Sequence, residues 1–248
     1  MIAPILFALL VSFPLAEAAD AEPEGVCAYA AGRFGVAAFT LVQSNRDLRR
    51  RGAAPPPVAT YLLGRAFREL GMRGLALRHL GDGESRGGSE LRLLARRELA
   101  RIHFDAADPA AVLEVWERTA GKADAETSYL AGLAAAQQRD WPRAAAILSE
   151  VASTDDLHPY ARYARAQSAA AGGDLVAALA DLEEVVRRPA TRREPRPPLE
   201  LAARDLLEPL GGDSGLLQIV FHSTERSVSL GDRAQLLRGK ILYLAGRT

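Results

Sequence analysis

The sequence predicts an all-α protein built from repeated pairs of antiparallel helices. The small residues Gly64, Gly132 and Ala166 share one period, because 132 − 64 is 68, or twice 34, and 166 − 132 is 34. The same spacing of 34 separates three further pairs: Ala144 and Ala178, Leu148 and Leu182, and Trp141 and Leu175. No stretch alternates with the two-residue period of a strand. A 34-residue unit made of two helical stretches is typical of a solenoid, a stack of helix pairs.

The composition is that of an ordinary folded protein. The chain has 248 residues, of which 48% are hydrophobic and 25% charged. Lysine plus arginine and aspartate plus glutamate both number 31, so the net charge is zero and offers no attraction to nucleic acid or anionic lipid. Cys27 is the only cysteine, which rules out an intrachain disulfide, and we expect it to be a small buried side chain.

Residues 1–18 have the pattern of a cleaved signal peptide. Pro14 breaks an apolar run over residues 5–11. Ala16 and Ala18 then supply the small side chains that precede a cut before Ala19. The apolar run is shorter than the roughly 20 residues of a membrane-spanning helix, so we expect no stable membrane insertion after cleavage. The pattern predicts a periplasmic or secreted protein.

The first helix pairs follow this segment. Residues 19–44 form a partial repeat, and a linker of arginines and prolines at residues 45–57 separates it from the repeats of residues 58–189. In the clearest unit, residues 58–70 form the first helix, Gly71 ends it in the left-handed conformation, and residues 72–80 form the second. We expect Gly64 and Ala76 to lie where these helices cross, because small residues let helix axes approach closely. The glycine-rich residues 81–88 predict an exposed loop that contains Glu84.

The next pair, residues 91–104 and 109–119, departs from the period. Strict phase puts Glu98 and Glu114 at buried positions. A slip of one residue, which we favour, buries a different set: Leu99, Ile102, Ala111 and Val115.

Two regular pairs and a changed C-terminal region complete the chain. The regular pairs are predicted over residues 127–138 and 141–151 and over residues 160–171 and 175–186. A stiff connector rich in proline and arginine, residues 190–198, leads to further helical repeats over residues 199–248. Gly239 and Gly246 match the first helix of a last repeat whose second helix is absent, so we expect this repeat to be incomplete.

The helix pairs carry the small, aromatic and turn residues of a known consensus: Gly64, Phe67, Gly71, Ala76, Leu80 and Trp141. With these residues the chain resembles a tetratricopeptide-repeat protein over about residues 25–186 and 239–246. Glu98 and Arg165 depart from that pattern, which has a small residue and a leucine at these places. The resemblance implies a right-handed superhelical array of helix pairs, a TPR-like α-solenoid, whose first helices line a concave groove.

The resemblance also implies which side chains line this groove. They are three tyrosines at one repeat position and four neighbours: Tyr61, Tyr129, Tyr163, Tyr160, Arg65, Arg68 and Gln167. A row of tyrosines offers a bound peptide rigid area and hydroxyl groups at low entropic cost. The alternative is that the rings pack against neighbouring helices.

The sequence shows no pattern of a catalytic or metal site, so we expect a protein that is not an enzyme and needs no cofactor. Residues 212–215 resemble the nucleophile stretch of trypsin-like proteases, but they lack the strand-rich framework of that family and predict a helix end capped by Ser214. The arginine-rich residues 46–51 predict a solvated connector and no nucleic-acid site. The four histidines lack the spacing of zinc ligands: His79, His103, His158 and His222.

The sequence therefore favours an exported, non-catalytic repeat scaffold that binds a protein or peptide partner in a concave groove. One alternative is the N-terminal helical arm of a longer periplasmic enzyme, since soluble lytic transglycosylases have a superhelical scaffold in front of a catalytic domain. Another is self-association through the uncapped C-terminal repeat.

Overall fold

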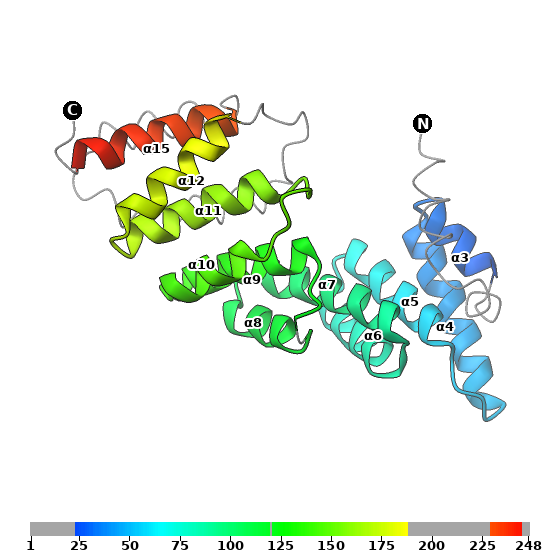
Figure 1. The fold of residues 1–248 in the computed structure, drawn as a ribbon. Coiled ribbons are helices and arrows are strands. Elements are labelled where there is room, and N and C mark those ends of the chain that lie inside the picture. The colour runs from blue at the N-terminus through cyan, green and yellow to red at the C-terminus, as the bar shows by residue number, and fades with distance from the viewer. Residues whose placement is uncertain (1–22, 120, 188–228, 245–248) are drawn as a thin grey trace. The chain divides into compact units, whose positions relative to one another are not determined.

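The computed structural model describes residues 23–119, 121–187 and 229–244, and the regular structure within these ranges is entirely α-helical. This part of the chain holds 11 helices and no strand, and neighbouring helices pack in sequence order (Figure 1). The all-α prediction is therefore confirmed for these ranges. The predicted signal peptide, the connector at 190–198, the helices predicted within residues 199–222 and Gly246 lie outside them.

The chain divides into two compact units, of which the first comprises residues 1–102. Its helices are α3 (Pro23–Ala30), α4 (Phe34–Arg50), α5 (Pro57–Glu69), α6 (Arg73–Arg86) and most of α7 (Ser89–Asp105). Here α3 packs on α4, α4 on α5 and α5 on α6, and the first helices of two successive pairs, α3 and α5, also touch. Cys27 is exposed, contrary to expectation, because α3 buries a different face through Gly25 and Ala28.

The second unit comprises residues 103–248. Its described helices are α8 (Pro109–Glu117), α9 (Ala125–Gln137), α10 (Trp141–Ser149), α11 (His158–Ala171), α12 (Leu175–Arg187) and α15 (Leu230–Leu244). Each packs on the next in this order, and α9 also touches α11. Ala234, Leu237 and Ile241 bury one face of α15 against α11 and α12, whereas Gly239 on the same helix is exposed.

Three helix pairs are fitted together by a glycine that lets a leucine of the second helix come close: Gly25 with Leu41, Gly64 with Leu80, and Gly132 with Leu148. A methyl group on these glycines would lie 2.7, 2.8 and 2.4 Å, respectively, from the leucine Cγ atom. The leucine follows its glycine at one spacing, because 41 − 25, 80 − 64 and 148 − 132 all equal 16. Gly64 therefore lies where α5 and α6 cross, as predicted, and meets Leu80 there, while Ala76, predicted for the same crossing, is fully buried.

The turn inside a helix pair has the same backbone geometry in five places of the described chain. A residue just beyond the first helix takes a positive φ, and the next amide donates to the carbonyl five residues back, which is a Schellman motif. The residues with positive φ are Gly32 (72°), Gly71 (73°), Ala107 (54°), Arg139 (61°) and Gly173 (89°). An aspartate follows three of them and caps the next helix through its side chain: Asp108, Asp140 and Asp174.

The pair formed by α7 and α8 is out of phase with the other pairs by two residues. Its left-handed residue, Ala107, lies 36 residues after Gly71 and 32 residues before Arg139, instead of 34 in both cases. The small residue seven positions before it, the spacing that Gly64 keeps from Gly71, is the fully buried Ala100. The predicted slip of one residue is therefore wrong, because the turn geometry requires two.

The residues for which the one-residue slip predicted burial or exposure follow that prediction only in part. Leu99, Ile102 and Val115 are buried and Glu114 is exposed, as the slip required, whereas Ala111 is only half-buried and Glu98 is buried. Burial of Glu98 is explained by its ion pairs, described below.

The predicted linker at residues 45–57 is partly helical, because α4 continues to Arg50. Asn45 is buried within this extension. Arg49 and Arg50 occupy the last turn, where the partial negative charge of a helix end favours cations. The connection between α4 and α5 is therefore shorter than the arginine and proline runs suggested.

The glycine-rich segment predicted as a loop is also helical, because α6 runs on to Arg86. A methyl group on Gly83 would lie 3.4 Å from the Cα atom of Tyr61, so the backbones of α5 and α6 are close at this point. Glu84 is buried and pairs with Arg96, whose Nε lies 2.7 Å from the carboxylate. Tertiary contacts thus override the low helix propensity of glycine here.

We expect Arg139→Gly to raise the free energy of unfolding of the second unit by about 0.5–1 kcal/mol, because a left-handed backbone strains a residue with a Cβ atom. Ala146→Gly, on the exposed side of α10, should instead lower it by about 1 kcal/mol. Both tryptophans, Trp116 and Trp141, lie in this unit, so urea denaturation followed by tryptophan fluorescence measures both changes. Changes of the same sign would contradict the left-handed conformation of Arg139.

Candidate peptide-binding surface

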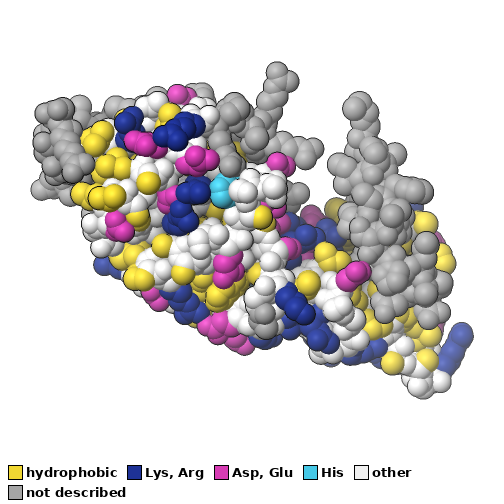
Figure 2. Space-filling view, viewed as in Figure 1, with side chains coloured by type: hydrophobic (Ala, Val, Ile, Leu, Met, Phe, Trp, Pro, Cys, Tyr) yellow, Lys and Arg dark blue, Asp and Glu magenta, His cyan; other side chains and the backbone are white. Residues whose placement is uncertain are grey.

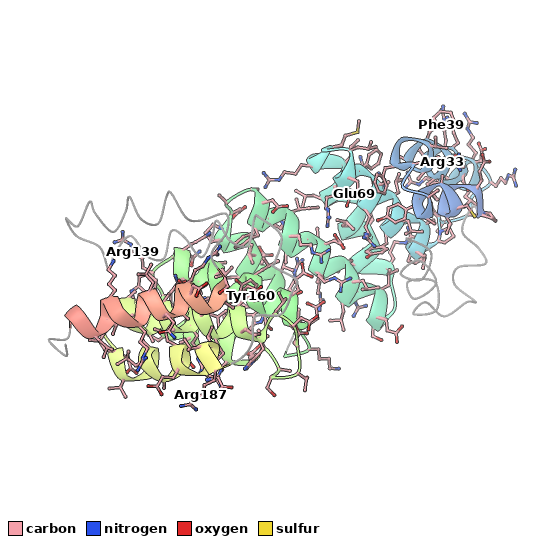
Figure 3. The ribbon with its side chains drawn as sticks, turned by 90° about the horizontal axis from the view of Figure 1, so that it is seen from above. Arg33, Phe39, Glu69, Arg139, Tyr160 and Arg187 are labelled. Atoms are coloured by element: carbon pink, nitrogen blue, oxygen red, sulfur yellow. The ribbon has the colours of Figure 1, made fainter. Side chains whose placement is uncertain are left out.

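The predicted row of groove tyrosines lies in the core. Tyr61, Tyr129 and Tyr163 keep only 1, 2 and 5% of their exposure, and Gln167 is completely buried. They lie on first helices that have neighbours on several sides, as α9 has in α8, α10 and α11. These side chains therefore fill the space between helices, as the packing alternative states, and offer no surface to a peptide. Tyr160 remains half-buried (Figure 3).

Arg65 and Arg68, also predicted for the groove, converge with Arg101 on one buried carboxylate, that of Glu98. The Glu98 side chain has no exposed surface. It accepts hydrogen bonds from Nη1 of Arg68 and, at 2.9 Å, from Nη1 of Arg101, and Nε of Arg65 lies 3.5 Å from its Oε1. Within α5 and within α7 the two contributing residues are three apart, which puts them on one helix face. We call these four residues the Glu98 cluster.

Two aromatic rings hold Arg65 from other sides. Its guanidinium carbon lies 5.3 Å from the ring centre of Tyr29 and 5.9 Å from that of Tyr61, which are cation–π distances. Burial raises the pKa of Tyr29 to about 12, although Arg65 acts in the opposite direction. Burial alone would lower the pKa of Arg65, but Glu98 and the two tyrosines more than offset this effect and the pKa is raised. Arg65 is thus a fixed, permanently charged cation.

The arginines of the Glu98 cluster have partners besides Glu98. Arg68 also donates from Nη2 to Glu69 at 2.9 Å, and Arg101 takes part in a further interaction. Glu98 is sealed from solvent, while the side chains of Arg65, Arg68 and Arg101 are 16, 18 and 23% exposed. A guanidinium group has five N–H donors, and two of them can bind one carboxylate in parallel. Each of the three arginines therefore keeps part of its side chain in contact with solvent.

A second buried carboxylate, in the other unit, is enclosed in a similar way. Asp181 on α12 accepts two bonds from Arg165, one of them at 2.6 Å from Nε, and another at 2.6 Å from Nη1 of Arg162. Nε of Arg162 donates to Nε2 of His158 at 3.3 Å, and Nδ1 of His158 lies 2.9 Å from the carbonyl oxygen of Val151. Because a carbonyl only accepts, the imidazole proton sits on Nδ1. This network ties the connection between α10 and α11 to α12.

The sequence contains a signal for both carboxylate clusters. Glu98 and Arg165 occupy positions where the repeat has a small residue or a leucine. A charge at a core position requires an opposite charge nearby, because an unpaired buried charge is very costly. Each departure therefore pointed to an ion pair with the neighbouring helix.

No three histidine, cysteine, aspartate or glutamate side chains come together as a possible metal site within the ranges that the structure describes. In those ranges no helix combines the length and the apolar character that crossing a membrane demands. His79 stacks on Phe67 with ring centres 5.5 Å apart, and burial lowers its pKa. The protease-like residues 212–215 lie outside the described ranges.

Comparisons with protein-family models and with curated proteins found no match to this sequence. Function therefore has to be inferred from the chemistry of the surfaces, and the Glu98 cluster combines fixed cations with access to solvent.

Proposed function

We propose that this chain is a non-catalytic helical-repeat scaffold, similar in architecture to tetratricopeptide-repeat proteins, that binds an acidic segment of a protein or peptide partner at the Glu98 cluster. The repeat architecture is supported by the recurring Schellman turns and by the glycine–leucine contacts at one spacing. The signal-peptide pattern of residues 1–18 supports a periplasmic or secreted site of action.

One observation carries the binding site: Glu98 is inaccessible, yet the three arginines around it reach solvent. Arg65 is moreover held between two rings, so it loses little side-chain freedom when an anion binds. A partner carboxylate would meet cations that are already held in place at this surface.

Fluorescence anisotropy with a fluorescein-labelled peptide of eight glutamates tests this proposal. The wild-type chain should bind the peptide at low ionic strength. The double variant Arg65→Gln/Arg101→Gln should bind at least about tenfold more weakly, because each charged hydrogen bond contributes about 1.5–3 kcal/mol. Glu98 keeps Arg68 in this variant, and circular dichroism verifies that it folds.

Arg73→Gln is the matched control, because Arg73 is an exposed arginine of α6 outside the cluster. Its effect on the dissociation constant should stay within about twofold, as for a screened surface charge. Equal losses in the control and the double variant, or no binding by the wild-type chain, would refute the proposed site.

A further inference from the structure

The helix α4 has an outer face that the described helices of its unit leave uncovered. It buries Ala37, Ala38, Leu41 and Asn45 on one side. The opposite side, which we call the α4 outer face, consists of exposed residues: Gly35, Val36, Phe39, Val42, Gln43, Arg46, Asp47, Arg49 and Arg50. The face therefore begins with apolar residues and ends with arginines.

The apolar part of the α4 outer face is strongly exposed. Val36, Phe39 and Val42 follow one another at intervals of three residues and are 45, 67 and 39% exposed. Figure 3 shows Phe39 on the outside of its unit, pointing away from the other helices. Figure 2 shows apolar and arginine side chains next to each other at the lower right, where α4 lies.

The repeat itself does not require an aromatic ring at this position. Phe39 follows the small residue of its pair, Gly25, by 14 residues. The residues at the same spacing in the other regular pairs are Arg78, Ala146 and Ala180, all exposed. The helix pairs thus pack without a large apolar side chain at this place, so Phe39 contributes to something other than the fold.

The end of the same face is basic. Asp47, the only acidic residue in α4, pairs with Arg50 at 3.3 Å, which leaves a positive excess among Arg46, Arg49 and Arg50. Arg49 and Arg78 lie near enough to His79 to help burial lower the pKa of this histidine. A partner of the α4 outer face must therefore present negative charge at this end.

The order of residues along α4 distinguishes a protein segment from a lipid bilayer as the anionic partner. A helix that lies on a bilayer has its apolar residues along its whole length and its cations at the sides. On α4 the arginines lie on the same face as Phe39, farther along the axis, so insertion of that face would drive them toward the hydrocarbon. The segregation along the axis instead matches a chain that runs beside α4 and changes from apolar to acidic.

We propose that the α4 outer face docks a segment of a protein partner whose apolar side chains cover Val36, Phe39 and Val42 and whose carboxylates pair with Arg46, Arg49 and Arg50. Seven to eleven residues of α4 separate Phe39 from these arginines, or about 10–17 Å at 1.5 Å per residue. The acidic residues of the partner therefore follow its apolar anchor by two to three helical turns, or by about three to five residues if the partner is extended. This docking site is independent of the function proposed for the Glu98 cluster.

Anisotropy with two labelled 14-residue helical peptides tests the docking site. Both carry leucine and phenylalanine one turn apart near one end; at the other end one has three glutamates and the other three lysines. The wild-type chain should bind the glutamate peptide at least about tenfold more tightly than the lysine peptide. Phe39→Ala and Arg46→Glu should each weaken this binding about tenfold, because a buried aromatic anchor and a charge pair are lost.

Two control variants test whether binding depends specifically on the α4 outer face. Val176→Ala removes an apolar side chain that is 75% exposed on α12 in the other unit, and it should leave binding unchanged. Arg65→Gln should also leave it unchanged, because Arg65 belongs to the Glu98 cluster. Phe39 and Arg46 are exposed, so both variants should fold like the wild-type chain in circular dichroism.

Three results would overturn the proposal. The first is equal binding of the glutamate and lysine peptides. The second is Phe39-dependent binding to phosphatidylglycerol vesicles, which would make a lipid surface the partner. The third is concentration-dependent self-association in analytical ultracentrifugation that Phe39→Ala abolishes, which would make a second copy of the chain the occupant.

Discussion

Gly64→Ala should lower the free energy of unfolding of the first unit by about 2 kcal/mol, although alanine is the better helix former. The added methyl group would lie 2.8 Å from Cγ of Leu80 and 2.9 Å from the backbone nitrogen of the same residue. The leucine side chain can rotate away, but the backbone nitrogen moves only if α6 separates from α5. Overpacking of this kind costs about 1–3 kcal/mol.

Gly81→Ala is the matched control for this substitution. Gly81 lies within α6, and a methyl group on it would meet nothing within 4 Å. The control should therefore stabilise the unit by up to about 1 kcal/mol through helix propensity. Since both tryptophans lie in the second unit, hydrogen exchange of peptides from α5 and α6 is the appropriate measurement. Stabilisation by both substitutions would disprove the close approach at Gly64.

Glu98→Ala should lower the free energy of unfolding of the first unit by about 3–5 kcal/mol, the cost of removing one partner from a buried ion pair. The substitution removes the carboxylate that Arg65, Arg68 and Arg101 share. Their side chains are at most 23% exposed, so water compensates only part of this loss. The same exchange measurement on α5 and α7 should show lost protection around all three arginines.

Glu114→Ala removes the same side chain from an exposed position on α8. Its effect should remain within about 0.5 kcal/mol, as for surface substitutions in general. A loss for Glu98→Ala no larger than this would mean that Glu98 does not organise the cluster, and the proposed anion site would lose its structural basis.

The helix bounds were predictable where the period is regular. The helix predicted over residues 127–138 is Ala125–Gln137, and that over residues 175–186 is Leu175–Arg187. In these pairs the turn residues and the small residues agree on a single register. Local preference and the packing of the repeat therefore indicate the same boundaries.

The offset of α7 and α8 was not predictable from the same signals. Alanines and other apolar residues occupy the core positions in more than one register, as Leu99 and Ala100 do. The pattern is then satisfied by a slip of one residue or of two. Only the backbone conformation of Ala107 decides between them, and alanine gives no sequence signal for a positive φ.

The sequence also could not predict which side chains of the first helices reach solvent. Periodicity identifies the buried side of a helix that has one neighbour, but a first helix contacts helices on several sides. Tyr129 and Tyr163 lie between such neighbours. In contrast, Arg65 and Arg68 keep access to solvent because ion pairs hold their charged ends at the edge of the packed helices.

The two-residue offset of the turn at Ala107 limits which duplications or deletions within the gene would keep the turns in register. Copying or deleting one 34-residue unit between α9 and α12 would preserve the alignment of every turn, because Arg139 and Gly173 are one full period apart. The same event with one breakpoint before Ala107 and the other after it would join pairs whose contacts no longer coincide. Such an event would therefore keep the turns in register between Arg139 and Gly173 and disturb them across residues 71–139.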